Sequence, residues 1–174
     1  MNDHEWPDRF RAVFAEGVKR YRAGRRSVDG FFDPEALAFL AGIGCGAQEL
    51  FDYVEDYCHG GDPSFETVLL VTAIRRDHFL NVQNGRPSGV VRAADTFPAK
   101  TDQLDGIAWL PRIIAKARAK LRGELPPELM YGCGGDRPFL RRHGMHLADF
   151  LHLVERAGDD DLRIARTLKA RLNP

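Results

Sequence analysis

The chain has 174 residues, and 25 lysines and arginines balance 25 aspartates and glutamates, so its formal net charge is zero. Because a dedicated binder of duplex DNA or RNA carries an excess of basic residues, we expect no nucleic-acid partner. Hydrophobic residues make up 44% and charged residues 29%, which is ordinary for a soluble globule of one domain or of two small domains in close contact.

Helix signals dominate the first half of the chain. Proline suits the first turn of a helix, and three prolines, two of them preceded by an aspartate N-cap, predict helices at 7–23, 34–40 and 62–82. Residues 47–58 add another helix, because their apolar and acidic side chains occupy opposite faces. The stretch 84–104 is rich in Gly, Pro, Ser, Asp and Thr, so we expect it to be irregular and to form a boundary or a functional loop.

Helices also dominate the second half, where we predict them at 105–122, from Arg137 onward, at 147–157 and at 160–172. The predicted fold class is therefore all-α, a compact bundle of about seven to eight helices. We divide it into an N-terminal helical half, 1–95, and a C-terminal helical half, 96–174, and we expect the halves to form one compact unit.

An internal repeat connects the two halves. A shift of about 100 residues places Phe39–Glu55 (FLAGIGCGAQELFDYVE) without gaps over Phe139–Glu155 (FLRRHGMHLADFLHLVE), and Phe, Leu, Gly, Val and Glu coincide. Chance agreement between two amphipathic helices is one explanation. A true duplication is the other, and it predicts two pseudo-repeated helical halves.

The stretch LDGIAWLPRIIAKARAKLRGELP, followed by YGCGGDRPFL, resembles a bacterial family of domains of unknown function, the one numbered 5069. The positions that fit the family pattern are Gly106, Leu110, Pro111, Arg112, Ile114, Lys116, Ala117, Arg118, Ala119, Gly123, Asp136, Phe139, Leu140 and Gly144. The resemblance covers roughly residues 96–172, and Ala115 departs from it where an aspartate is usual. It implies a family and imports no activity.

Cellular location follows from three features of the sequence. The apolar run at 68–74 is far too short to span a bilayer, so we expect no membrane partner. The first ten residues, MNDHEWPDRF, lack the basic and apolar regions of a signal peptide. Cys45, Cys58 and Cys133 form no CxxC pair, which indicates reduced thiols. We therefore predict a cytoplasmic protein.

The loop YGCGGDRPFL at 131–140 is the first candidate site. Its glycines can expose consecutive N–H groups and form an anion-binding nest, in which we include Gly134 and Gly135. Cys133 precedes a helix start, where a thiolate is stabilised, and we expect Asp136 to cap that helix through its side chain. The alternative is a glycine-rich turn with a structural aspartate and a half-buried cysteine.

Arg112 and Lys116 form the second candidate site. They lie four residues apart near the start of a helix, where cations are disfavoured, so they need an acidic partner or an anionic ligand. The acidic partners that we consider are Asp105, Asp136, Glu49 and Glu55. A structural ion-pair network and ligand binding both remain open, and Arg75 is a further candidate ligand residue.

Metal binding and cofactor binding are not predicted. Glu49, Asp52 and Asp56 line one helix face, but no Glu-x-x-His motif accompanies them. The histidines near the C-terminus, with Cys133, match no familiar zinc spacing; they are His143, His146 and His152.

Three functions fit these features, and the sequence leaves open whether the protein is an enzyme. The first is a binding or interaction domain for a small anionic ligand, with Arg112, Lys116, Gly134, Gly135, Asp136 and Arg75 as ligand-binding residues. The second is a cysteine-dependent enzyme with Cys133 as the nucleophile and, as base, His78, His143 or His146. The third is a homodimeric protein-interaction module that uses exposed aromatic residues, for which the candidates are Trp6, Trp109 and Phe31-Phe32.

Overall fold

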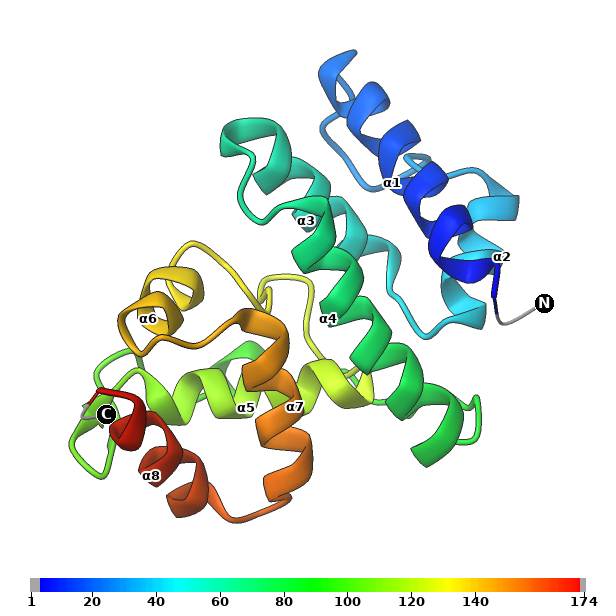
Figure 1. The fold of residues 1–174 in the computed structure, drawn as a ribbon. Helices are drawn as coiled ribbons and strands as arrows, with labels where there is room; N and C mark the ends of the chain where they lie inside the picture. Colours follow the sequence, from blue (N-terminus) through cyan, green and yellow to red (C-terminus); the bar gives the residue numbers. More distant parts are fainter. Residues whose placement is uncertain (1–3, 173–174) are drawn as a thin grey trace. The chain divides into compact units, whose positions relative to one another are not determined.

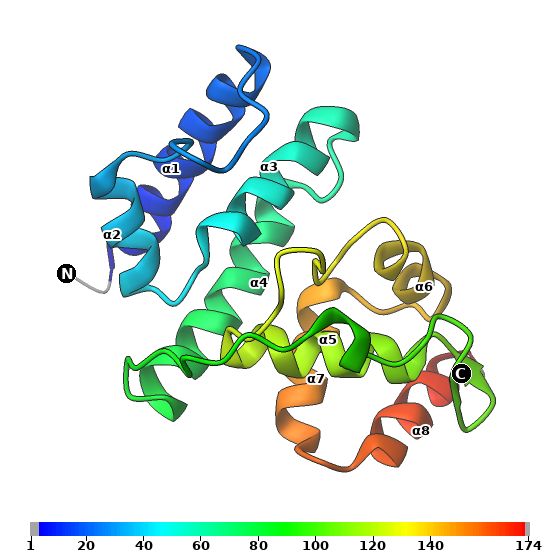
Figure 2. The ribbon, with the colours of Figure 1, turned by 180° about the vertical axis from the view of Figure 1, so that it is seen from behind.

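The computed structural model describes residues 4–172 of the chain (Figures 1 and 2). Within this range there are eight α-helices, one π-helical turn, one 3-10 turn and one two-stranded sheet. The all-α prediction is therefore confirmed. The chain divides into two compact units, Met1–Arg86 and Pro87–Pro174.

Four helices form the N-terminal unit. They are α1 (Trp6–Arg22), α2 (Pro34–Gly42), α3 (Ala47–Gly60) and α4 (Phe65–Asp77), and the π-helical turn η1 (His78–Val82) follows them. Helix α1 packs against α3 and α4 (Figure 1). Aromatic rings fill this contact, because Phe14 lies 5.2 Å from Phe65 and 5.4 Å from Tyr57 between ring centroids.

The helix starts of this unit follow the predicted capping only in part. Asp33 caps α2 as predicted, since its carboxylate accepts from Ala36 N at 2.8 Å. The prediction that Asp62 caps the helix now seen as α4 is wrong. Ser64 caps α4 instead, and its hydroxyl accepts from Thr67 N at 3.2 Å.

The C-terminal unit combines helices with a small hairpin. Its elements are η2 (Ala94–Thr96), β1 (Gln103–Leu104), β2 (Ile107–Ala108), α5 (Leu110–Arg122), α6 (Asp136–Arg142), α7 (Leu147–Ala157) and α8 (Asp161–Leu172). Helix α5 crosses α7 in both views, and α7 also packs against α6 and α8 (Figures 1 and 2).

The hairpin corrects the predicted helix start at Asp105. Asp105 and Gly106 both have positive φ, 50° and 76°, which is the geometry of a tight hairpin turn between β1 and β2. Helix α5 therefore begins only at Leu110, with Pro111 in its first turn. Among residues 4–172, no helix has both the length and the apolar character needed to cross a membrane.

Two glycines at corresponding turns provide a test of the N-terminal packing. Gly44 and Gly144 both have positive φ, 70° and 57°. A Cβ on Gly44 would lie 2.6 Å from the Phe79 ring, whereas nothing lies within 4 Å of a Cβ on Gly144.

We predict that Gly144→Ala costs about 1–2 kcal/mol, the strain of a left-handed alanine. Gly44→Ala should cost about 1–3 kcal/mol more, because the methyl group also overpacks the Phe79 ring. Urea denaturation followed by circular dichroism measures both losses. Equal losses in the two variants would contradict the close approach of Phe79 to Gly44.

Candidate functional site

A buried ion pair joins α5 to α6. The Lys116 ammonium donates to Oδ2 of Asp136, and the two side chains are 2% and 0% exposed. Lys116 lies on the inner face of α5 beside the buried residues Ile113 and Ala117. Because a charge without a partner is very costly in such surroundings, each of the two residues requires the other.

Two further donors complete the surroundings of the Asp136 carboxylate. Trp109 Nε1 donates to Oδ1 at 2.9 Å, and Gly132 N donates to Oδ2 at 2.9 Å. The predicted role of Asp136 as a side-chain helix cap is therefore wrong: the N-cap of α6 is Gly135, and no side chain caps it. The carboxylate points inward because a buried ammonium without a counter-charge would destabilise the fold more than an uncapped helix end that water can reach.

Cys133 also contacts the Lys116 ammonium. Its sulfur is 3.3 Å from Lys116 Nζ, and the residue is half-buried. Its backbone carbonyl accepts from Asp136 N and Arg137 N at 3.0 and 3.1 Å, which holds the loop at the start of α6. The structure thus brings Lys116, Cys133 and Asp136 together at the start of α6.

The glycines of the loop allow close packing. A Cβ on Gly135 would lie 2.4 Å from the Trp109 ring, and one on Gly132 would lie 2.5 Å from Leu147. Gly132 also has a φ of 84°. Gly134 is exposed, with nothing within 4 Å of a Cβ. The Trp109 ring therefore lies against Gly135, whereas Gly134 faces open space.

Sequence reasoning missed the roles of two aromatic residues. Trp109 has a φ of 73°, a strained conformation for a bulky residue, and its bond to Asp136 and its contact with Gly135 hold it there. Tyr131 is buried, and its hydroxyl donates to Leu147 O at 2.7 Å. Burial raises the pKa of Tyr131 well above its usual value, and the nearby Asp136 charge adds to this.

The two candidate arginines are engaged elsewhere. Arg112 donates to Pro98 O at 2.6 Å and so ties α5 to the preceding loop. Arg75 lies in the N-terminal unit, where it donates to Gln83 at 2.8 Å and lies 5.2 Å from the centroid of the Phe79 ring. Burial lowers the pKa of the Arg75 guanidinium.

Two of the three candidate bases, His143 and His146, have backbone partners. His143 Nδ1 is 2.8 Å from Phe139 O, and His146 Nδ1 accepts from Ala148 N at 3.2 Å as the N-cap of α7. Within residues 4–172, no three His, Cys, Asp or Glu side chains form a cluster that could hold a metal ion.

The C-terminal unit is thus a helical domain built around a buried Lys-Asp pair with a cysteine beside it. Residues 96–173 match the family model described as Domain of unknown function (DUF5069). This match confirms the resemblance predicted for the C-terminal half. Neither the curated proteins nor the solved structures contain a match to the chain.

The first prediction from this site concerns the ion pair. Lys116→Met leaves the Asp136 carboxylate buried without its counter-charge, so we expect a loss of about 3–5 kcal/mol in the free energy of unfolding. Lys169→Met is the matched control, since it removes a bridge to Asp105 whose side chains are 46% and 39% exposed. That loss should stay below about 1 kcal/mol, and similar losses in the two variants would contradict a buried pair.

The second prediction concerns Asp52 on α3. Burial raises its pKa to about 6 from an ordinary 3.8, despite a hydrogen bond from Gln48. The folded state therefore holds the proton more tightly than the unfolded state does, and this stabilisation is lost as the pH rises from about 4 through about 6. Asp52→Asn should flatten the fall in stability across that window, whereas the exposed control Asp29→Asn should not. Parallel curves for wild type and Asp52→Asn would refute the raised pKa.

Proposed function

We propose that the C-terminal unit carries out thiol chemistry at Cys133. In this proposal Cys133 is the nucleophile, Lys116 stabilises its sulfur in the negatively charged form, and Asp136 positions Lys116. The observation that supports it is the 3.3 Å distance between Cys133 Sγ and Lys116 Nζ, where Lys116 also forms the buried ion pair with Asp136. The thiolate is the reactive form of cysteine, and a neighbouring cation favours it.

The hydrogen bonds to Asp136 strengthen this interpretation. Trp109 and Gly132 each donate to the carboxylate, so they take up part of its negative charge. The ammonium is then neutralised less completely by Asp136 and retains attraction for the sulfur. This arrangement also fixes the position of Nζ, because Lys116 has little freedom at 2% exposure.

A small electrophile suits the half-buried sulfur better than a large one. With hydrogen peroxide as the oxidant, the thiolate attacks one oxygen and forms an S–O bond, the O–O bond breaks, and the departing hydroxide takes a proton from the solvent to become water. The product on the protein is a sulfenic acid. A cysteine-dependent activity on such electrophiles is the function that this geometry favours.

The binding of a small anion stays a prediction that the geometry favours less. The Lys116 side chain is only 2% exposed to an external anion, Arg112 donates to Pro98 O, and the Trp109 ring lies against Gly135. Homodimer formation likewise stays a prediction.

Alkylation rates test the proposed thiol chemistry. At neutral pH, iodoacetamide should label Cys133 at least about tenfold faster than Cys58, which is also half-buried, since a charge-assisted contact contributes about 1.5–3 kcal/mol. Peptide mass spectrometry separates the two sites. The double variant Lys116→Met/Asp136→Leu removes the ammonium without leaving a lone charge, and it should lower the Cys133 rate to that of Cys58.

Lys100, an exposed lysine of the same unit, provides the control, because Lys100→Met should leave both rates unchanged. Unfolding would also remove the contact with Lys116 and expose both cysteines alike, so the helical circular dichroism of the double variant must match that of the native protein. Labelling of Cys133 at or below the Cys58 rate in the native protein would rule the proposal out.

A further inference from the structure

The turn after α2 repeats the backbone geometry of the turn after α6. Cys45 N donates to Leu40 O at 2.9 Å in the first turn, and Met145 N donates to Leu140 O at 3.0 Å in the second. The positive-φ glycine lies in the same place in both turns. These residues are separated by 100 positions, the offset of the sequence repeat.

The next helices also begin alike. The N-caps Gly46 and His146 have φ and ψ of −75° and 147° and of −75° and 150°. Leu50 N then donates to Gly46 O at 3.1 Å, and Phe150 N to His146 O at 3.0 Å. Glycine and histidine have very different side chains, so the side chains do not explain the matching φ and ψ angles. The agreement is a property of the backbone at this turn.

The cores of the two units use the same positions. Helix α1 packs on α3, and α5 packs on α7. Buried residues coincide at the same offset; the pairs include Phe10 and Leu110, Phe14 and Ile114, Tyr21 and Leu121, Phe31 and Tyr131, Phe39 and Phe139, Leu50 and Phe150, and Val54 and Val154. Two unrelated helical units would not share this turn, the start of the helix after it and the buried positions in register, which favours duplication.

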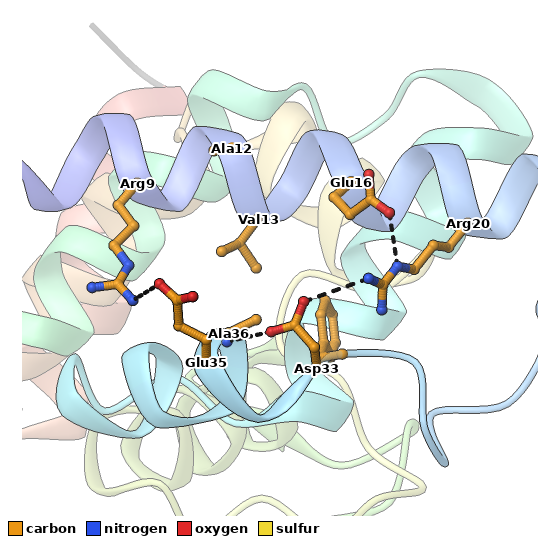
Figure 3. Close-up of a pocket in the computed structure, with 9 residues that line it drawn as sticks. Arg9, Ala12, Val13, Glu16, Arg20, Asp33, Glu35 and Ala36 are labelled. Atoms are coloured by element: carbon orange, nitrogen blue, oxygen red, sulfur yellow. Dashed lines mark hydrogen bonds and ion pairs between the residues drawn. The ribbon is translucent and has the colours of Figure 1, made fainter.

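The residues that lie 100 positions before those of the Lys116 site line a pocket in the N-terminal unit. Lys116, Cys133 and Asp136 correspond to Glu16, Asp33 and Ala36, and Trp109 and Gly135 correspond to Arg9 and Glu35. All five N-terminal residues line one pocket of about 250 Å³ between α1 and α2 (Figure 3).

The difference between a closed and an open site has a local cause. In the C-terminal unit, the Trp109 ring lies so close to Gly135 that no Cβ would fit there. In the N-terminal unit, Arg9 and Glu35 replace this ring and glycine, and they pair with each other at 2.9 Å. The space that an indole covers in one unit is therefore open in the other.

The pocket has charged ends and an apolar middle (Figure 3). One end is the Arg9–Glu35 pair. At the other end, Arg20 is shared between Glu16 at 2.9 Å and Asp33 at 3.5 Å. The apolar residues that line the pocket are Ala12, Val13, Phe32 and Ala36.

We propose that this pocket binds a small zwitterion, an amino carboxylate with a short hydrocarbon body. Arg9 uses Nη2 for Glu35, and the rest of its guanidinium, on a side chain that is 40% exposed, suits a ligand carboxylate. At the other end, Glu16 and Asp33 share one guanidinium, so the excess negative charge suits a ligand ammonium. Lys19 approaches Glu16 only at 3.8 Å and is 80% exposed, so it compensates little of that excess, and the α2 amide of Ala36 takes up only part of the Asp33 charge.

The size and lining of the pocket restrict the ligand further. Ligand pockets for drug-sized molecules start at about 300 Å³, so this one suits a body of only a few carbons. The apolar middle removes those carbons from water, while the charged ends set their orientation. The site is independent of Cys133, and its failure would leave the proposed thiol chemistry untouched.

NMR titration of the full chain with 5-aminopentanoate tests the proposal, with pentanoate and pentylamine as single-charge controls. We expect shifts centred on α1 and α2, and at least about tenfold weaker binding of each control, because each lacks one charge-assisted contact. Arg9→Ala should weaken binding about tenfold or more. Arg22→Ala, which removes an exposed arginine of α1 outside the pocket, should not.

A second variant copies the closed site. Arg9→Trp/Glu35→Gly introduces the residues found at the corresponding C-terminal positions and should abolish binding while leaving the helical circular dichroism unchanged. The proposal is overturned if 5-aminopentanoate causes no shifts in the native protein. It is also overturned if pentanoate or pentylamine binds as tightly, or if Arg22→Ala weakens binding as much as Arg9→Ala.

Discussion

The salt bridge between Lys116 and Asp136 is the constraint on which the C-terminal unit depends. Both side chains lie out of water, where the loss of hydration of two charges is offset only by close pairing and by further hydrogen bonds. Trp109, just before α5, and the Gly132 amide, in the loop before α6, supply those bonds, so both segments must reach the carboxylate. The small residue at position 135 and the half-buried sulfur of Cys133 follow from that requirement.

Under the duplication that we infer, the same backbone arrangement carries different charged residues in the two units. Where the C-terminal unit has a buried lysine, the N-terminal unit has Glu16, and its cation comes from Arg20 one turn later on α1. The ion pair of the N-terminal unit, Arg20 with Glu16, therefore lines the pocket between α1 and α2. Because the apolar positions of both units coincide, the polar residues can change without disturbing the core.

Local signals predicted most of the fold, and tertiary contacts explain what was missed. The caps and prolines predicted the helices, while the hairpin turn at Asp105–Gly106 was a local signal that we overlooked. Asp136 was among the acidic partners considered for Lys116, but its role as a helix cap was wrong. The two residues are 20 positions apart, and the loop between them decides the direction of the carboxylate. Trp109 could not be predicted as its donor, because its strained backbone depends on the finished packing.

The most direct measurement of the central claim is NMR of the lysine ammonium groups in protein labelled with ¹⁵N at Nζ. An ammonium that is 2% exposed and bonded to a carboxylate exchanges slowly with water, so we predict a protected Nζ–H resonance that disappears in Lys116→Met. A spectrum in which the resonance assigned to Lys116 exchanges as fast as those of surface lysines would contradict the buried ion pair, and with it the arrangement that we describe around Cys133.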